Sequence, residues 1–545
     1  IAGGLSGVSL SANWMWPCRN TGEDARLYKA VAACSDFAIA LGINIPTGKD
    51  SLSMKQKYKD AEVLAPGTVI ISSVGHCTDI KQVVQPVLKR GGGSIYYVNL
   101  SCDAYQLGGS ALAQVLSSIG TTAPDVKDAA YFKKAFDAIQ TLIKEGKIVA
   151  GHDINSGGLI TTLLEMCFAD NDLGATVDLT ALGKEDTVKV LFAENAGEVF
   201  QADSSVESYL AAQGVKAVKI GEVKGAGVLH VKNGEAALHF DIAELRDLWM
   251  LTSYLLDKQQ TQHDKATERY QNYTEQPLVY AFPSHFTGKR PARPTKRPVA
   301  AVLREKGSNS EREMANALYL AGFEVRDVCM TDLISGRETL EEVQFLGAVG
   351  GFSNSDALGS AKGWAGAFRY NDKAKRALEN FFKREDTLSV GICNGCQLFM
   401  ELELINPEHA EHGKMHHNDS GKHESGFVSV VIPENNSVML QSLAGTRLGV
   451  WISHGEGKFH LPLPESDYNI VAKYAYEGYP ANPNGSDYNA AMLADKSGRH
   501  LVTMPHIERS AFPWNWAYYE EGRTDEVSPW VEAFVNAREW LTEKG

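Results

Sequence analysis

The sequence predicts an α/β protein, and three local patterns carry this prediction. From residue 299 onward, apolar runs alternate with helix-like segments such as residues 310–321, which is typical of a parallel sheet flanked by helices. Near residue 393, an apolar run leads through a glycine-flanked cysteine into a second apolar segment. Closer to the start, apolar residues recur at helical spacing at Leu27, Val31, Cys34, Ala38 and Leu41. Together these patterns favour strands and helices along the whole chain.

The N-terminal part predicts one helix followed by two strands. The helix should cover residues 23–41 and begin at TGED, residues 21–24, which resembles a capping box. Strand-like residues 68–74 follow the loop that contains residues 48–51, and strand-like residues 94–100 open a second α/β unit. We place a domain boundary between these strands, in the glycine-rich stretch at residues 89–93.

A cysteine in a sharp turn is the most informative feature of the C-terminal region. Cys393 lies in GICNG, residues 391–395, between strand-like residues 388–390 and helix-like residues 398–400. Glycines on both sides suit a strained strand–turn–helix connection, the nucleophile elbow. The unpaired N–H groups at the start of the helix favour a thiolate there. A buried structural cysteine in a glycine-containing loop is the alternative.

The segment MPHIER, residues 504–509, supplies a base and a group to orient it. If the backbone stays extended, His506 and Glu508 lie on the same side of the strand, with Ile507 opposite. Glu508 then holds one imidazole nitrogen while the other nitrogen faces Cys393. The order Cys, His, Glu is typical of class I glutamine amidotransferases and differs from the Ser, Asp, His order of α/β-hydrolases. For this segment alone, a surface His–Glu pair is the alternative.

Attack on a carboxamide also needs hydrogen-bond donors for the oxygen that becomes negatively charged. The apolar run at residues 345–349 ends in Gly350 and Gly351, which indicates a strand that enters a glycine turn. We expect the backbone amides of Gly351 and Asn394 to form this oxyanion hole. An ordinary strand-to-loop turn is the alternative.

Composition and charge disfavour several classes of function. The chain has 545 residues, 44% of them hydrophobic, and a net charge of −14. These values fit a globular protein of several domains and argue against nucleic-acid binding. No apolar run is long enough to span a bilayer and the start shows no signal pattern, so we expect no membrane partner and a cytoplasmic location.

The cysteines do not suggest a disulfide framework or a metal site. All eight are scattered through a large chain. Cys393 and Cys396 form a C-x-x-C pair, which is a possible metal or redox signal, but no second such pair or nearby Cys/His pair completes a zinc site.

Five further segments carry a resemblance to a known family. They are LSANWM at residues 10–15, PTGKDSLSM at 46–54, the stretch 351–365, SHGEG at 453–457 and YPANPNGS at 479–486. With these segments and the elbow, the chain resembles the C-terminal part of the phosphoribosylformylglycinamidine synthase family of purine biosynthesis over nearly all of its residues. Cys396 adds to this resemblance, since many other triad amidotransferases have a histidine at that position.

The resemblance implies a domain order. Residues 1–92 would be part of an N-terminal-type PurM-like synthetase domain, and residues 93–250 a C-terminal-type PurM-like domain. Residues 251–297 would be a linker whose basic run is solvated. Residues 298–545 would be the class I glutamine amidotransferase. Members of the family are much longer, so we expect the chain to be a fragment that lacks an upstream half with most of the ATP-binding machinery.

The resemblance also implies Mg²⁺ and a nucleotide, ATP or ADP. HDINSGG, residues 152–158, matches the family pattern His-Asp-x-Ser-Asp-Gly-Gly except at positions 155 and 156. Asp153 would bind Mg²⁺, which takes one or two protein carboxylates beside nucleotide phosphates, and Asn155 would contact the nucleotide. Asp153 as a turn or N-cap residue is the alternative. Whether such a site is catalytic or structural stays open.

Two further groups of polar residues are candidate contacts. One group would contact substrate or phosphate, or else form a capped and solvated turn: Lys49, Asp50 and Ser51. The other group would shape the glutamine pocket, or else serve the core and the loop caps: His454, Asn418 and Ser420.

The activity that the resemblance implies is the ATP- and glutamine-dependent conversion of formylglycinamide ribonucleotide (FGAR) to formylglycinamidine ribonucleotide (FGAM). Cys393 would attack glutamine, His506 would move protons, and Glu508 would orient His506. The released ammonia would travel internally to the synthetase site. We expect the chain alone to make no FGAM. The alternatives are another glutamine-dependent synthetase and a non-catalytic scaffold with an amidotransferase fold.

Overall fold

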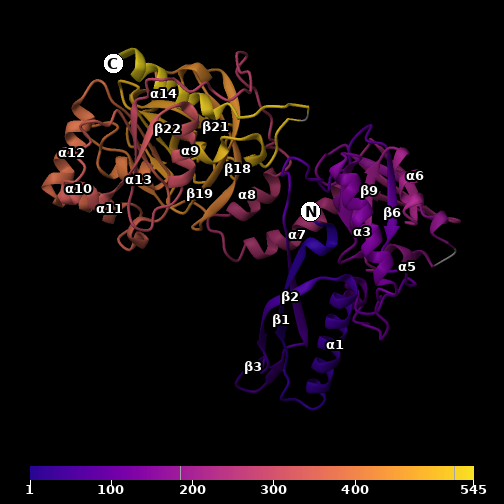
Figure 1. Ribbon diagram of the computed structural model, residues 1–545. Coiled ribbons are helices and arrows are strands. Elements are labelled where there is room, and N and C mark those ends of the chain that lie inside the picture. The colour runs from indigo at the N-terminus through magenta and orange to yellow at the C-terminus, as the bar shows by residue number, and fades with distance from the viewer. Residues whose placement is uncertain (184–185, 521, 545) are drawn as a thin grey trace. The chain divides into compact units, whose positions relative to one another are not determined.

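The computed structural model describes residues 1–183, 186–520 and 522–544, which divide into two compact units, Ile1–Met250 and Leu251–Gly545 (Figure 1). Each unit has its own sheets and its own buried apolar core. In these described ranges, no helix combines the length and the apolar character needed to cross a membrane. The stretch predicted as a linker contains the end of helix α7 (Ile242–Asp257) and all of helix α8 (Lys265–Asn272).

The first unit begins with a small sheet in the order β2-β1-β5. Strand β1 (Val8–Met15) pairs in parallel with β2 (Asn44–Ser51) and antiparallel with β5 (Thr68–Gly75). Helix α1 (Glu23–Leu41) and strand β5 confirm the predicted helix and strand. The predicted capping box is wrong, because Gly22 takes the N-cap position with a φ of 83° and no side chain caps the helix. A short hairpin adds β3 (Lys55–Lys57) and β4 (Glu62–Leu64).

A second sheet in this unit has the strand order β12-β11-β8-β10-β6-β9-β7. Its strands are β6 (Ser94–Asn99), β7 (Ile148–Asp153), β8 (Gly174–Asp178), β9 (Gly197–Ala202), β10 (Ala217–Lys224), β11 (Val228–Asn233) and β12 (Ala236–Asp241). Its helices are α2 (Ala111–Val115), α3 (Ala129–Lys144), α4 (Gly158–Glu165), α5 (Thr187–Phe192) and α6 (Ser205–Ala212). Along β6, Ile95 and Tyr97 belong to one apolar cluster while Tyr96 and Val98 belong to another. Successive side chains point to opposite faces, so apolar side chains cover both faces of this sheet.

The second unit is built on a sheet in the order β14-β13-β15-β16-β23-β22-β21-β18-β19. Its strands are β13 (Val299–Arg304), β14 (Glu324–Cys329), β15 (Phe345–Ala348), β16 (Leu388–Ile392), β18 (Glu424–Ile432), β19 (Thr446–His454), β21 (Asn469–Tyr474), β22 (Ala490–Ala494) and β23 (His500–Thr503). The pairs from β14 to β23 are parallel, as predicted, and the pairs from β23 to β19 are antiparallel. A separate small ladder joins β17 (Lys414–His416) and β20 (Lys458–His460).

Helices flank the parallel part of this sheet (Figure 1). They are α9 (Glu311–Ala321), α10 (Met330–Ser335), α11 (Lys362–Tyr370), α12 (Asp372–Lys383), α13 (Asn394–Glu401) and α14 (Trp530–Lys544). Helix α9 packs against α14, while α11 packs against α12 and α13. Every residue of β15 and β16 is buried, as expected for strands covered on both faces. Ligand sites in such folds form at the carboxyl ends of parallel strands, where the loops after β13, β15, β16 and β23 lie.

Candidate active site

The loop after β16 has the geometry of a nucleophile elbow, as predicted. Cys393 follows β16 directly with φ 52° and ψ −103°, and α13 begins at the next residue. Glycine is required on both sides by close packing: a Cβ on Gly391 would lie 2.5 Å from Gly395 O, and one on Gly395 would lie 2.2 Å from Ala348 O. The turn therefore brings the cysteine to the start of a helix.

The thiol of Cys393 is buried but has a polar contact. Its exposed fraction is 5%, and its Sγ donates to Ser453 O at 3.6 Å. Ser453 lies in the SHGEG segment at the end of β19, which is separated from the elbow in sequence but beside it in the fold. The sequence did not single out Ser453 as a contact of the cysteine.

His506 and Glu508 form a buried pair. His506 Nδ1 lies 2.6 Å from Glu508 Oε1, and both side chains are buried. The expected extended backbone is wrong here, because β23 ends at Thr503 and residues Ile507–Ser510 form a 3₁₀ turn. Pro505 cannot donate to the sheet, which favours an end of the strand before it. The turn, rather than strand alternation, brings the two side chains together.

The imidazole of His506 also faces the elbow. A Cβ placed on Gly350 would lie 2.8 Å from His506 Cε1 and 3.4 Å from Cys393 Cβ, so both side chains reach the same small space. Burial opposes the charged imidazole, but Glu508 and the Cys393 thiol together raise the pKa of His506 to about 10. Because Nδ1 is held by Glu508, Nε2 is the nitrogen left for the thiol.

The turn after β15 has the features expected of an oxyanion hole. Gly351 has a φ of 112°, and a Cβ there would lie 2.5 Å from Asn309 N. Within the described ranges, neither the Gly351 N–H nor the Asn394 N–H donates a hydrogen bond to another residue. Two free amides beside the elbow are the arrangement that a developing oxyanion needs.

Of the three residues predicted for the glutamine pocket, Asn418 and Ser420 lie in a loop of this unit and His454 ends strand β19. Asn418 braces a loop, because its Nδ2 donates to His454 O at 2.7 Å and its Oδ1 accepts from Gly457 N at 3.0 Å. Ser420 is buried and its carbonyl accepts from Gln262 N at 2.8 Å. His454 is 2% exposed. Burial and, to a smaller extent, the charge of His506 lower the pKa of its imidazole to about 3. Neither ring nitrogen of His454 has a hydrogen-bond partner among the described residues.

Gln397 is a polar residue of the site that the sequence analysis missed. It is buried in α13, its Nε2 donates to Glu456 O at 2.8 Å, and its Oε1 accepts from Asn394 Nδ2 at 2.9 Å. These bonds tie the first turn of α13 to the SHGEG segment. A glutamine directly before the apolar residues 398–400 of the helix was the available signal.

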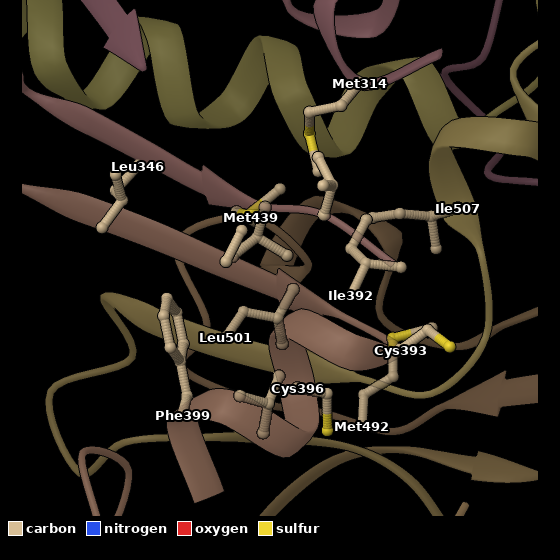
Figure 2. Close-up of a cluster of buried hydrophobic side chains, with 14 of the residues drawn as sticks. Met314, Leu346, Ile392, Cys393, Cys396, Phe399, Met439, Met492, Leu501 and Ile507 are labelled. Atoms are coloured by element: carbon tan, nitrogen blue, oxygen red, sulfur yellow. The ribbon is translucent and has the colours of Figure 1, made fainter. Parts of the chain in front are cut away.

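Cys396, the second cysteine of the C-x-x-C pair, is a core residue. Figure 2 shows it within a cluster of buried apolar side chains that includes Phe399 and Leu501. It is fully buried, and burial raises the pKa of its thiol well above the usual range. In the described part of the chain, no group of three or more metal-ligating side chains is present.

In the first unit, Asp153 ends β7 with an exposed side chain. His152 Nδ1 lies 3.3 Å from Asp153 Oδ1, and His152 Nε2 lies 3.3 Å from Glu165 Oε2. Glu198 pairs with Asp153 across the ladder of β7 and β9, and burial plus the charge of Asp153 raise the pKa of Glu198 to about 7. Helix α4 is capped by Gly157 without a side-chain bond, so Asp153 is not its N-cap. Two neighbouring carboxylates are ligands that fit Mg²⁺.

Asn155 lies exposed in the turn between β7 and α4. A loop was expected for Lys49, Asp50 and Ser51, but these residues are in strand β2. They lie opposite Asn13, Trp14 and Met15 of β1. Strand pairing with β1 overrides the turn tendency of Pro46 and Gly48. The glycine permits this close pairing, since a Cβ on Gly48 would lie 2.2 Å from Ala12 O. The capped-turn alternative is therefore wrong as well.

Three family models match successive parts of the chain. Residues 2–76 match the FGAR-AT PurM_N-like domain, residues 92–232 the C-terminal domain of AIR synthase related protein, and residues 297–541 the CobB/CobQ-like glutamine amidotransferase domain. The domain limits drawn from the sequence, 1–92, 93–250, 251–297 and 298–545, stay predictions.

Among curated relatives, a probable phosphoribosylformylglycinamidine synthase, chloroplastic/mitochondrial, from Arabidopsis thaliana is 39% identical over 98% of this chain and 40% of its own length. The phosphoribosylformylglycinamidine synthase of Homo sapiens is 39% identical over 99% of this chain and 43% of its own. This chain thus spans about two fifths of the length of these relatives.

The solved structure of PurLQS from Thermotoga maritima is 26% identical and covers 45% of this chain and 100% of that chain. Its TM-score of 0.35 is too low to support a conclusion on its own. The resemblance predicted from the sequence is confirmed by the relatives and the family models. Over nearly all of its residues the chain is similar to phosphoribosylformylglycinamidine synthases, and residues 297–541 match the model of the CobB/CobQ-like glutamine amidotransferase domain.

Proposed function

We propose that the second unit is a glutaminase in which Cys393 is the nucleophile, His506 the acid–base group and Glu508 the residue that positions His506. The observation that carries this proposal is the buried 2.6 Å contact between His506 Nδ1 and Glu508 Oε1, next to the Cys393 elbow. An imidazole fixed on one nitrogen by a carboxylate keeps its other nitrogen for proton transfer with the thiol.

The geometry supports a sequence of four chemical steps. The Cys393 thiolate attacks the side-chain carboxamide carbon of glutamine, and the oxygen takes the negative charge between the amides of Gly351 and Asn394. His506 gives its proton to the leaving nitrogen, and ammonia departs as the glutamyl thioester forms. His506 then takes a proton from water, which hydrolyses the thioester. Glutamate leaves, and the thiolate and imidazolium are restored.

For the complete polypeptide, we propose the ATP- and glutamine-dependent conversion of FGAR to FGAM, with internal transfer of ammonia between the two centres. The names of the relatives and the order of the three domain matches support this proposal. FGAR, glutamine and ATP are then its small-molecule substrates. Since the chain spans about two fifths of these relatives, we expect FGAM synthesis to need the upstream part. The cytoplasm remains the proposed location, although one relative is named chloroplastic/mitochondrial.

In the first unit, we propose that Asp153 binds Mg²⁺ and Asn155 contacts the nucleotide, ATP or ADP. The pair of neighbouring carboxylates, Asp153 and Glu198, supports a cation there, since its charge would offset the repulsion between them. Three residues of β2 are proposed substrate or phosphate contacts: Lys49 and Asp50, which are exposed, and Ser51, which is half-buried.

Glutamate release from glutamine tests the glutaminase. We expect Cys393→Ala to abolish release by the complete polypeptide, whereas Cys396→Ala, in the same C-x-x-C pair, should retain most of it. Absence of any cysteine-dependent release would favour the non-catalytic scaffold. Cysteine-dependent release without ATP-dependent FGAM formation by the complete polypeptide would favour a different glutamine-dependent synthetase.

A further inference from the structure

The segment Ser308–Ser310, after β13, braces the turn that contains Gly350 and Gly351. Asn309 N donates to Gly350 O at 2.8 Å, and Ser310 Oγ accepts from Gly350 N at 3.3 Å. Both backbone polar groups of Gly350 are thereby satisfied by this segment. The bonds fix the peptide planes of the turn and leave the N–H of Gly351 unpaired.

Arg509 connects this brace to the triad. Its Nη2 donates to Asn309 Oδ1 at 2.6 Å, a contact between residues 200 positions apart in the sequence. Its Nε lies 3.9 Å from Glu508 Oε1 and 3.9 Å from Glu313 Oε1 and makes no hydrogen bond among the described residues. One guanidinium therefore contacts both the brace of the oxyanion turn and the carboxylate that holds His506.

We propose that Arg509 is a positioning residue that keeps the oxyanion turn in register with the Cys393–His506 pair. The proposal rests on the proposed glutaminase. A planar guanidinium can donate to Asn309 with one nitrogen while another lies within ion-pair distance of Glu508, which suits this task better than the single compact charge of a lysine. The path of the effect is short: Arg509 holds Asn309, and Asn309 holds the carbonyl of Gly350, next to the amide of Gly351.

This path predicts a specific kinetic defect. Loss of the contact should loosen the Gly351 amide, which acts on the oxygen of the tetrahedral intermediate more strongly than on bound glutamine. The kcat for glutamate release should therefore fall while KM changes little. Alkylation of Cys393 by iodoacetamide depends on the thiolate and not on an oxyanion hole, so its rate should stay unchanged.

The experiment compares variants of the complete polypeptide. In Arg509→Gln and in Asn309→Ala, we expect kcat to fall by about 10- to 100-fold, with KM and the alkylation rate within about twofold. The double variant should be no slower than the slower single variant, because both changes break one path. Arg509→Lys should recover only part of the loss. Arg326→Gln, which removes a half-buried arginine of edge strand β14 that pairs with Glu342, should leave kcat unchanged.

Three results would overturn the proposal: kcat of Arg509→Gln within twofold of the wild type, multiplicative defects in the double variant, or equal losses of kcat and alkylation rate. Equal losses of kcat and alkylation rate would mean that Arg509 supports only the local fold. A lower melting temperature of Arg509→Lys would show such a loss of stability independently. A wild type that releases no glutamate in a cysteine-dependent way would instead overturn the proposed glutaminase, and this proposal with it.

Discussion

His506 Nδ1 and Glu508 Oε1 lie 2.6 Å apart, although only one residue separates them in the sequence. The contact forms because the chain turns into a 3₁₀ segment after the end of the strand. The backbone N–H of His506 donates to Trp451 O at 2.8 Å and fixes this corner to β19. The pair thus joins the end of the parallel part of the sheet to its antiparallel part, beside the Cys393 elbow. This corner is the structural basis of the proposed chemistry.

Glu508→Gln should nearly abolish glutamate release. The amide keeps the shape of the side chain but removes the charge that, with Cys393, raises the pKa of His506 to about 10. We expect a loss of about 10²- to 10⁴-fold in kcat and a lower pKa of His506, measured by NMR titration of the ring. Because the folded-state pKa of His506 is raised, the stability that the pair contributes is present below about pH 6.5 and is lost as pH rises through about 10. An unchanged rate in Glu508→Gln would contradict the assigned role.

Gly351→Ala should impair both stability and activity. A residue with a Cβ would be strained at a φ of 112° and would approach Asn309 N to 2.5 Å. We expect a loss of about 1–3 kcal/mol in the free energy of unfolding and a fall in glutamate release, measured by urea unfolding and enzyme assay. Gly366→Ala is the matched control: it lies inside α11, its nearest neighbour would be 4.0 Å away, and alanine should stabilise the helix by about 0.5–1 kcal/mol. Equal effects of the two changes would contradict this account.

His454 should make the second unit less stable in acid. Burial lowers its pKa to about 3 from an ordinary value of 6.5, so the unfolded chain binds a proton that the folded chain does not. Stability should therefore fall as pH decreases from about 6.5 towards 3, by about 1.4 kcal/mol per pH unit for this one group. In His454→Gln, urea unfolding between these pH values should show a shallower dependence. The exposed His417→Gln should keep the wild-type slope, and identical slopes in all three proteins would exclude the prediction.

Asp153→Asn should weaken the response of the first unit to a nucleotide. For the complete wild-type polypeptide, Mg²⁺ with ADP should raise the melting temperature by roughly 5 °C if the ligand is well above its Kd. The variant should lose most of this increase because the amide has no charge for the cation. Asp125→Asn, a change at an exposed aspartate of the same unit, should keep it. A full increase in Asp153→Asn would rule out Asp153 as the ligand.

The features that sequence reasoning predicted well are local ones. The elbow follows from an apolar run, two glycines and a helix start that lie within a few residues of one another, and helix α1 follows from its apolar spacing. The His506–Glu508 pair was expected from strand alternation, but a turn after Pro505 produces it. Residues Lys49–Ser51 were expected in a loop and are in a strand, because pairing with β1 decides their conformation.

The features that sequence reasoning missed depend on distant contacts. Ser310 meets Gly350 across 40 residues and Arg509 meets Asn309 across 200, so no local pattern could indicate either contact. Cys393 meets Ser453 across 60 residues in the same way. The order of strands in the sheet places the loops after β13, β15, β16 and β23 close together, whereas β19 is at the far edge of the sheet and reaches the site through its bridge between Trp451 and His506.

The most direct test of the central claim is mass spectrometry of the complete polypeptide quenched in acid during turnover of glutamine. The account predicts that Cys393 gains one glutamyl group and that Cys396 stays unmodified. In His506→Gln, the adduct should accumulate if Cys393 still attacks glutamine. Cys393→Ala should show no adduct. A glutamyl group on any other residue, or glutamate release that persists in Cys393→Ala, would contradict the account.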